Sequence, residues 1–150
     1  MLDPSGYDAG KKVKGRKRHI LVDTLGLLLS VVVHPADVQD RDGAFHLLRR
    51  ARRMFPFIER IFADGGYAGQ KMALVVRRTG AWKLQIVKRS DAPGFEVLPK
   101  RWIVERTFAW ISRNRRLARD FERYATTVTA FVRVAMIRIM LKRLAANTSS

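Results

Sequence analysis

Two acidic residues of this sequence stand where a carboxylate could do chemistry, and the first of them is Asp64. It follows the apolar run that ends at Ala63, and Gly65 and Gly66 come directly after it. An acid at the carboxyl end of a strand lies at the edge where open α/β sheets bind ligands. The glycines permit a tight turn and leave no side chain to obstruct a metal ion or a phosphate. A plain Asp-Gly turn explains the same residues, because Asp bonds the backbone that follows it.

The second acid, Glu105, lies in a segment with helical periodicity. On a helical wheel Glu105 falls beside the apolar stripe of Val104, Phe108 and Ile111, on a face that also carries Arg101. Glu105 is therefore expected to lie at the edge of the hydrophobic core that this stripe contacts. An ordinary i,i+4 ion pair between Arg101 and Glu105 is the simpler explanation.

A strand-end Asp and a helix-borne Glu near a cationic surface are together what divalent-metal phosphoryl chemistry needs. Mg²⁺ or Mn²⁺ takes hard oxygen ligands and keeps waters for substrate phosphates. Two such ions can stabilise the attacking and leaving oxygens of an in-line displacement. We therefore expect Asp64 and Glu105 to be catalytic metal ligands and to approach one another in space, although neither could hold the metals unaided.

The charge balance points to a polyanionic partner. The 150 residues include 30 Lys and Arg against 13 Asp and Glu, a net charge of +17. No apolar stretch reaches the ~20 residues of a membrane-spanning helix, and no cleavable signal opens the chain. The absence of cysteine excludes a disulfide framework and a thiolate metal site. We expect a nucleic-acid partner and no membrane.

Basic residues gather in residues 1–18 and again after Glu105. The first group predicts an extended or disordered basic arm that contacts phosphates, and the second a track along DNA backbone; a solvated tail and a solubility function are the alternatives. Trp102 and Trp110 are predicted to be core residues rather than base-stacking platforms. The predicted DNA-binding residues of the two groups are Lys11, Lys12, Lys14, Arg16, Lys17, Arg18, Arg113, Arg115, Arg116 and Arg119.

The elements that must position these residues alternate between strand and helix patterns. The strands are expected in a hairpin over 19–33 and at 58–63 and 82–87, and the helices at 42–54, 70–78, 101–119 and 127–146. A loop at 91–99 separates the two C-terminal helices from the rest. The order predicts one α/β domain over residues 19–150, with helices packed on a mixed sheet, behind the arm of residues 1–18.

These stretches resemble the DDE transposases of bacterial insertion sequences. The matching segments are GYDAGKKVKGRKRHILVDTLGLLLSVVVHPADVQDRDGA, IFADGGYAG and RWIVERTFAWISRNRRLARDFER, from Gly6 to Arg123. The resemblance implies an RNase H-like catalytic core and metal-dependent cleavage and strand transfer, in which water or a 3′-hydroxyl attacks a phosphodiester. The family's middle acid maps to Asp64. Its final acid lies in an Arg-x-x-x-Glu helix and maps to Glu105, with Arg101 as the associated arginine, also expected to contact DNA.

The sequence departs from the family pattern in two ways. Where the family helix often has a Tyr and a Lys, this chain has Leu98 and Ser112, with Arg113 adjacent. The family's first acid sits on a strand before the hairpin, and this chain begins too late to contain it. The resemblance therefore implies an N-terminally truncated fragment that lacks the first strand and is inactive alone.

The resemblance also implies the partners and the location of the protein. The expected partner is DNA, both transposon ends and target, in the bacterial cytoplasm with the nucleoid. A homodimer and complementation by an upstream fragment remain open. Two other functions fit the charge: a nucleic-acid-binding remnant without chemistry, and a basic RNA- or ribosome-binding protein, which would leave Asp64 and Glu105 as coincidences.

Overall fold

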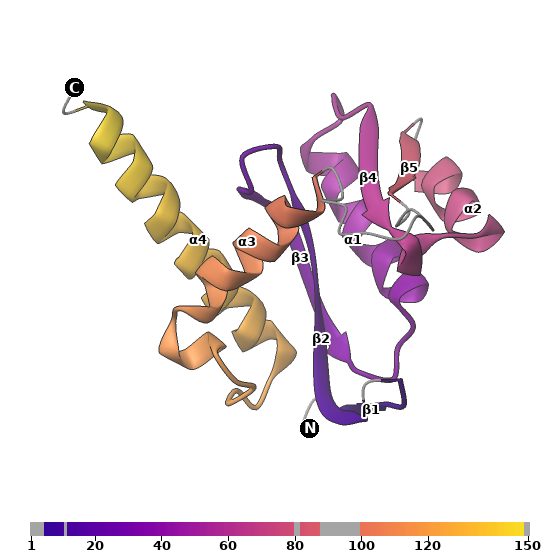
Figure 1. Cartoon of the computed structure of the whole chain (residues 1–150), viewed down its shortest axis with the longest axis horizontal. Helices are drawn as coiled ribbons and strands as arrows, with labels where there is room; N and C mark the ends of the chain where they lie inside the picture. The colour runs from indigo at the N-terminus through magenta and orange to yellow at the C-terminus, as the bar shows by residue number, and fades with distance from the viewer. Residues whose placement is uncertain (1–4, 11, 80–81, 88–99, 149–150) are drawn as a thin grey trace, which may run out of the picture.

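A computed structural model describes residues 5–10, 12–79, 82–87 and 100–148 of the chain. Three strands come first, helices and strands then alternate up to β5, and two helices complete the described chain (Figure 1). The elements are β1 (Gly6–Asp8), β2 (Val13–Val22), β3 (Leu28–Pro35), α1 (Asp40–Met54), β4 (Arg60–Asp64), α2 (Gln70–Thr79), β5 (Lys83–Val87), α3 (Arg101–Ser112) and α4 (Ala125–Thr148), with 3₁₀ turns η1 (Gly65–Tyr67) and η2 (Arg115–Leu117).

The described strands form two sheets. β1, β2 and β3 pair antiparallel, with Ile20 opposite Val31, and β4 pairs with β5 in parallel, with Asp64 opposite Val87. The α/β class is thus present, but the prediction of one mixed sheet is wrong. β2 and β4 do not pair with each other, and Arg18–Leu21 and Ile61–Ala63 instead border a cavity of about 140 Å³ that side chains from α1 and α3 also line.

The long β2–β3 hairpin is a ribbon through the centre of the molecule. α1, β4, α2 and β5 lie on one side of it, and α3 and α4 lie on the other (Figure 1). At its tip the Asp23 carboxylate accepts hydrogen bonds from the backbone of Leu25 and Leu27 at 2.9 and 2.8 Å. Gly26 adopts a φ of 81°, and its carbonyl accepts a hydrogen bond from the Thr107 hydroxyl of α3 at 2.8 Å. The predicted hairpin is therefore confirmed, and its turn is attached to α3.

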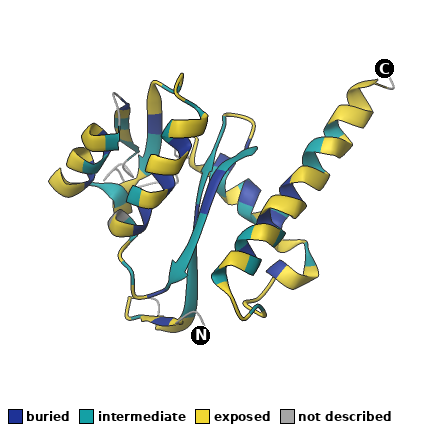
Figure 2. Cartoon of the chain, turned by 180° about the vertical axis from the view of Figure 1, so that it is seen from behind, coloured by how far each residue is buried: buried dark blue, intermediate teal, exposed yellow. Residues whose placement is uncertain are grey.

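Two separate hydrophobic cores flank the ribbon (Figure 2). Each core contains residues from the helices on its own side of the ribbon. Complete burial of one large aliphatic side chain contributes roughly 1.5–3 kcal/mol to the stability of the fold. The first core consists of Ala44, Leu48, Ala51, Ile61, Met72, Val76 and Trp82. The second consists of Val31, Ile111, Leu117, Val128, Val132 and Ala135.

The described part of residues 1–18 is folded onto the rest of the chain. β1 pairs with the start of β2, Gly6 opposite Gly15, and the Asp8 carboxylate accepts a hydrogen bond from Gly10 N in the turn between them. Arg16 forms an ion pair of 2.9 Å with Asp120 near the start of α4. The described part of the basic segment is therefore largely strand rather than a separate arm, and Arg16, Lys17 and Arg18 have partners within the fold.

The C-terminal helices differ from their predicted lengths. α3 ends at Ser112 instead of continuing to residue 119, since the Asn114 side-chain amide donates to the carbonyls of Trp110 and Ile111 and the chain then turns to bury Leu117. α4 is longer than predicted. Its buried residues lie between Val128 and Met136, and the remainder extends past the body of the molecule (Figure 1). The predicted loop at 91–99 lies outside the described residues.

No helix in the described ranges has both the length and the apolar run that crossing a bilayer requires.

Candidate active site

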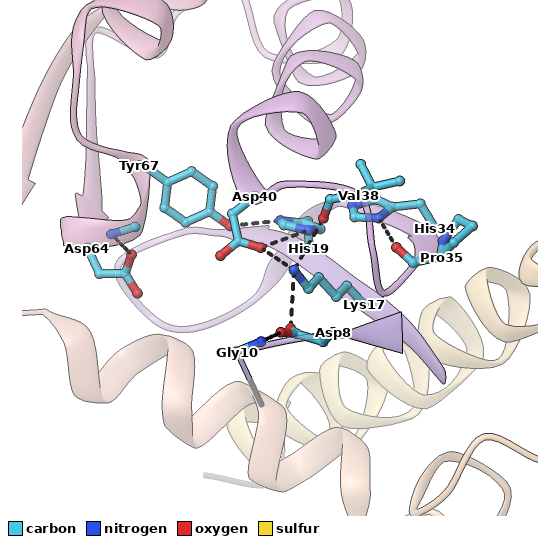
Figure 3. Close-up of polar contacts among 11 residues, drawn as sticks. Asp8, Gly10, Lys17, His19, His34, Pro35, Val38, Asp40, Asp64 and Tyr67 are labelled. Atoms are coloured by element: carbon cyan, nitrogen blue, oxygen red, sulfur yellow. Dashed lines mark hydrogen bonds and ion pairs between the residues drawn. The ribbon is translucent and has the colours of Figure 1, made fainter. Parts of the chain in front are cut away.

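Asp64 is the last residue of β4, and its carboxylate is exposed. Its Oδ1 accepts a hydrogen bond of 3.0 Å from Gly66 N, which closes the η1 turn (Figure 3). A Cβ placed on Gly65 would meet nothing within 4 Å. Both explanations of the sequence therefore hold for the geometry: Asp64 forms the turn, and open space lies beside it.

Tyr67 joins the Asp64 turn to the central ribbon. Its hydroxyl lies 2.7 Å from Nδ1 of His19, a residue of β2 that is 5% exposed (Figure 3). Burial raises the pKa of Tyr67, and the negative charges of Asp40 and Asp64 raise it further. The phenol therefore stays protonated and can donate to His19, which fixes the end of the turn.

Asp40, at the start of α1, is a second carboxylate close to Asp64. A Cβ on Gly66 would lie 3.2 Å from Asp64 Oδ1 and 3.5 Å from Asp40 Oδ2, so the two acids border the same glycine. Asp40 Oδ1 is 3.3 Å from Lys17 Nζ. Burial lowers the pKa of Lys17, but hydrogen bonds to Asp40 and Asp8 outweigh it and the net shift is upward. Lys17 is therefore a permanent cation that balances the charge of Asp40.

Glu105 is exposed on α3 and pairs with Arg101, with 2.9 Å between Arg101 Nε and Glu105 Oε1. The predicted i,i+4 ion pair is thus present. Val104, the neighbour of Glu105, and Ala63, the neighbour of Asp64, line the same cavity between α3 and the two sheets. The first turn of α3 also approaches β4, because Lys100 Nζ lies 3.6 Å from the centroid of the Phe62 ring.

The donor set for a metal ion is small. Within the described ranges, no three His, Cys, Asp or Glu side chains come together as metal ligands. Asp64 suits a hard cation, because its carboxylate is exposed beside open space. Glu105 can bind a cation only when its ion pair with Arg101 is broken. The charge of Asp40 is already balanced by Lys17.

The predicted DNA-binding residues fall into two groups. Lys12, Lys14, Arg101, Arg113, Arg115, Arg116 and Arg119 are exposed, whereas Arg16, Lys17 and Arg18 are partly buried and hydrogen-bonded within the chain. Burial lowers the pKa of Arg18, which donates to the Leu117 carbonyl at 2.8 Å. Lys11 lies outside the described residues. The cations that remain open to a ligand are mostly those after Glu105.

The two tryptophans of α3 are not core residues. Trp102 is 47% exposed and Trp110 is partly buried. Arg106 lies between them along the helix, with its Cζ 4.4 Å from the Trp102 ring and 4.7 Å from the Trp110 ring. The i,i+4 spacing of Trp102, Arg106 and Trp110 is the sequence signal that could have predicted this stacking.

Comparison with known proteins shows the family. Residues 3–140 match the family described as "Transposase DDE domain", so the chain belongs to this family. A Burkholderia cepacia protein that bears the name of a transposase for insertion sequence element IS402 is 33% identical over 128 residues, which are 80% of this chain and 60% of the relative. The chain therefore spans about 60% of the length of that relative. No solved structure matches the chain.

Proposed function

We propose that this chain is part of a transposase catalytic domain that binds DNA and contributes two carboxylates, Asp64 and Glu105, to metal-dependent cleavage and strand transfer. Membership of the family supports it. The observation that carries it is the exposed carboxylate of Asp64 at the end of β4, beside a glycine whose surroundings are open. An RNase H-like arrangement of the strands belongs to the proposal.

The chain's own residues have distinct tasks in this proposal. Asp64 and Glu105 would hold a divalent cation, which would supply charge neutralisation at a phosphodiester and activation of the attacking hydroxyl. Glu105 becomes available when Arg101 turns to a DNA phosphate, because a phosphate is a strong bidentate partner for arginine. The Tyr67–His19 hydrogen bond keeps the Asp64 turn in place. A third acid would come from another polypeptide segment, either an upstream fragment or a second copy of the chain.

Binding of Mn²⁺ tests the assignment of both acids at once. In the amide NMR spectrum of the chain, paramagnetic Mn²⁺ should broaden the signals of Gly65 and Gly66 together with those around Glu105. Asp64→Asn should remove both effects, because it removes a charged ligand while keeping the shape of the side chain. Broadening that affects only one of the two regions, or that survives in Asp64→Asn, would contradict the proposal.

The same experiment distinguishes the catalytic proposal from the alternative of a nucleic-acid-binding remnant that has no catalytic activity. A remnant would bind duplex DNA and show no Mn²⁺ effect at either acid. DNA binding itself should be electrostatic and insensitive to sequence, since the chain carries a net charge of +17. A binding constant that falls steeply along a salt series is expected, and a flat dependence would contradict DNA as the partner.

A further inference from the structure

A cationic groove runs between α3 and α4, away from the two acids. A cleft of about 600 Å³ is lined by Arg113 of the α3 end and by Arg138, Lys142 and Arg143 of α4. A neighbouring cleft of about 320 Å³ shares Arg113 and Arg138 and adds Arg115 and Arg116 of η2. We call these two clefts the α3–α4 groove. Its α4 cations were not among the DNA-binding residues predicted from the sequence.

The positive charge of the groove is hardly balanced within the fold. Neither cleft has an acidic residue in its lining. Of the six cations, Arg116 is the one with an ion pair among the described residues, at 2.6 Å from Glu122. Elsewhere the fold does place acids beside its cations, as with Arg16 and Asp120. Clustered cations without partners repel one another and attract a polyanion.

Aromatic rings hold two of these arginines without neutralising them. Arg143 Cζ lies 4.6 Å from the centroid of Trp110, and Arg116 Cζ lies 5.2 Å from that of Phe131. A cation–π contact orients a guanidinium but leaves its N–H donors and its charge available. Arg143 is thereby positioned before a ligand arrives, which reduces the entropy lost on binding.

We propose that the α3–α4 groove binds the sugar-phosphate backbone of duplex DNA. This inference rests on the proposed function for the identity of the polyanion. Unpaired arginines match phosphates, because their planar donor groups form bidentate hydrogen bonds with them. The groove also shares α3 with Glu105, eight residues or about 12 Å along the helix from Arg113.

Charge-neutral substitutions with a matched control test the groove. The groove variant is Arg138→Gln/Lys142→Gln/Arg143→Gln, and the control is Lys71→Gln/Arg77→Gln/Lys83→Gln, three exposed cations of α2 and β5. Both remove three charges. At 0.15 M salt the groove variant should bind a 20-base-pair duplex on the order of 100-fold more weakly than the unmodified chain, and the slope of log K against log [salt] should become shallower by about 3. The control variant should bind the duplex about 3-fold more weakly. Equal losses in the two variants would overturn the proposal.

Acetylation of lysines in the unmodified chain gives an independent measurement. Bound duplex should protect Lys142 from acetic anhydride and leave Lys83 reactive, as mass spectrometry would show. Duplex binding without protection of Lys142 would overturn the groove as the binding site and leave DNA binding by the chain intact. If the chain binds no duplex, DNA binding in the proposed function fails as well. Anionic lipid vesicles provide a second probe, and protection of Lys142 by vesicles but not by DNA would show that the groove binds lipid headgroups instead.

Discussion

The hydroxyl of Tyr67 joins the Asp64 turn to the ribbon, since it lies 2.7 Å from His19 Nδ1. Tyr67→Phe keeps the ring and removes this hydrogen bond. We expect the free energy of unfolding to fall by about 1–2 kcal/mol, the usual effect of losing a buried hydrogen bond. Urea denaturation measures the change. Tyr7→Phe is the matched control, because Tyr7 is 56% exposed, and equal losses in the two variants would contradict this role.

The same hydroxyl should make the protein sensitive to alkali. Its pKa is raised from 10.0 in the folded chain, mainly by burial. Above pH 10 the unfolded chain loses the phenolic proton and the folded chain keeps it, so stability that is complete below pH 10 is lost as the pH rises. The pKa of Lys17, raised by Asp40 and Asp8 against its burial, acts in the same direction. Tyr67→Phe should flatten the loss of stability between pH 9 and 11, and an unchanged pH profile would refute the assignment.

Residue positions were predictable where the signal is local. Asp64 follows an apolar run and precedes two glycines, and Arg101 and Glu105 are one helical turn apart, so the sequence alone indicates a strand-end acid and an ion pair. The contacts of Tyr67 with His19 and of Lys17 with Asp40 join residues that are 48 and 23 positions apart. No periodicity predicts such contacts, because they depend on how α1 and the turn pack on β2.

Among the elements, the hairpin tip depends on Gly26. Its φ of 81° disfavours any side chain, and a Cβ there would lie 2.8 Å from the Thr107 hydroxyl oxygen. Gly26→Ala should cost about 1–3 kcal/mol and weaken the attachment of the tip to α3. Gly65→Ala is the control, since a Cβ at Gly65 meets nothing within 4 Å. Thermal unfolding compares the two variants, and a loss in Gly65→Ala as large as that in Gly26→Ala would contradict the prediction.

The element boundaries that failed did so for reasons of packing. Residues 113–119 lack Pro and Gly, so their sequence predicts a continuation of the α3 helix. The Asn114 side chain instead donates a hydrogen bond to an α3 carbonyl, and the chain turns so that Leu117 is only 2% exposed. The strand pattern of β2 and β4 was correct, but no sequence signal showed that the two would border a cavity instead of pairing. The local sequence determines whether a segment forms a strand, whereas the packing of the whole fold determines which strands pair.

At the scale of the molecule, the chain alone should not cut DNA. The proposal assigns it Asp64 and Glu105, and placing two ions for in-line attack needs a third acid. Purified protein incubated with supercoiled plasmid and Mg²⁺ or Mn²⁺ should produce no nicked circles above the metal-only background. Nicking that disappears in Asp64→Ala would falsify the expectation and would direct attention to Asp8 or Asp23 as the missing ligand.

The two cores on opposite sides of the ribbon have a consequence for cooperativity. Ile20 packs against the second core and Leu21 against the first, so neighbouring residues of one strand are the link between them. Such a link is narrow, and the halves can melt at different temperatures. Calorimetry should give a van't Hoff enthalpy below the calorimetric one. Leu48→Ala should lower one transition and Val132→Ala the other, whereas a common shift of a single peak would show that the ribbon couples both halves into one melting unit.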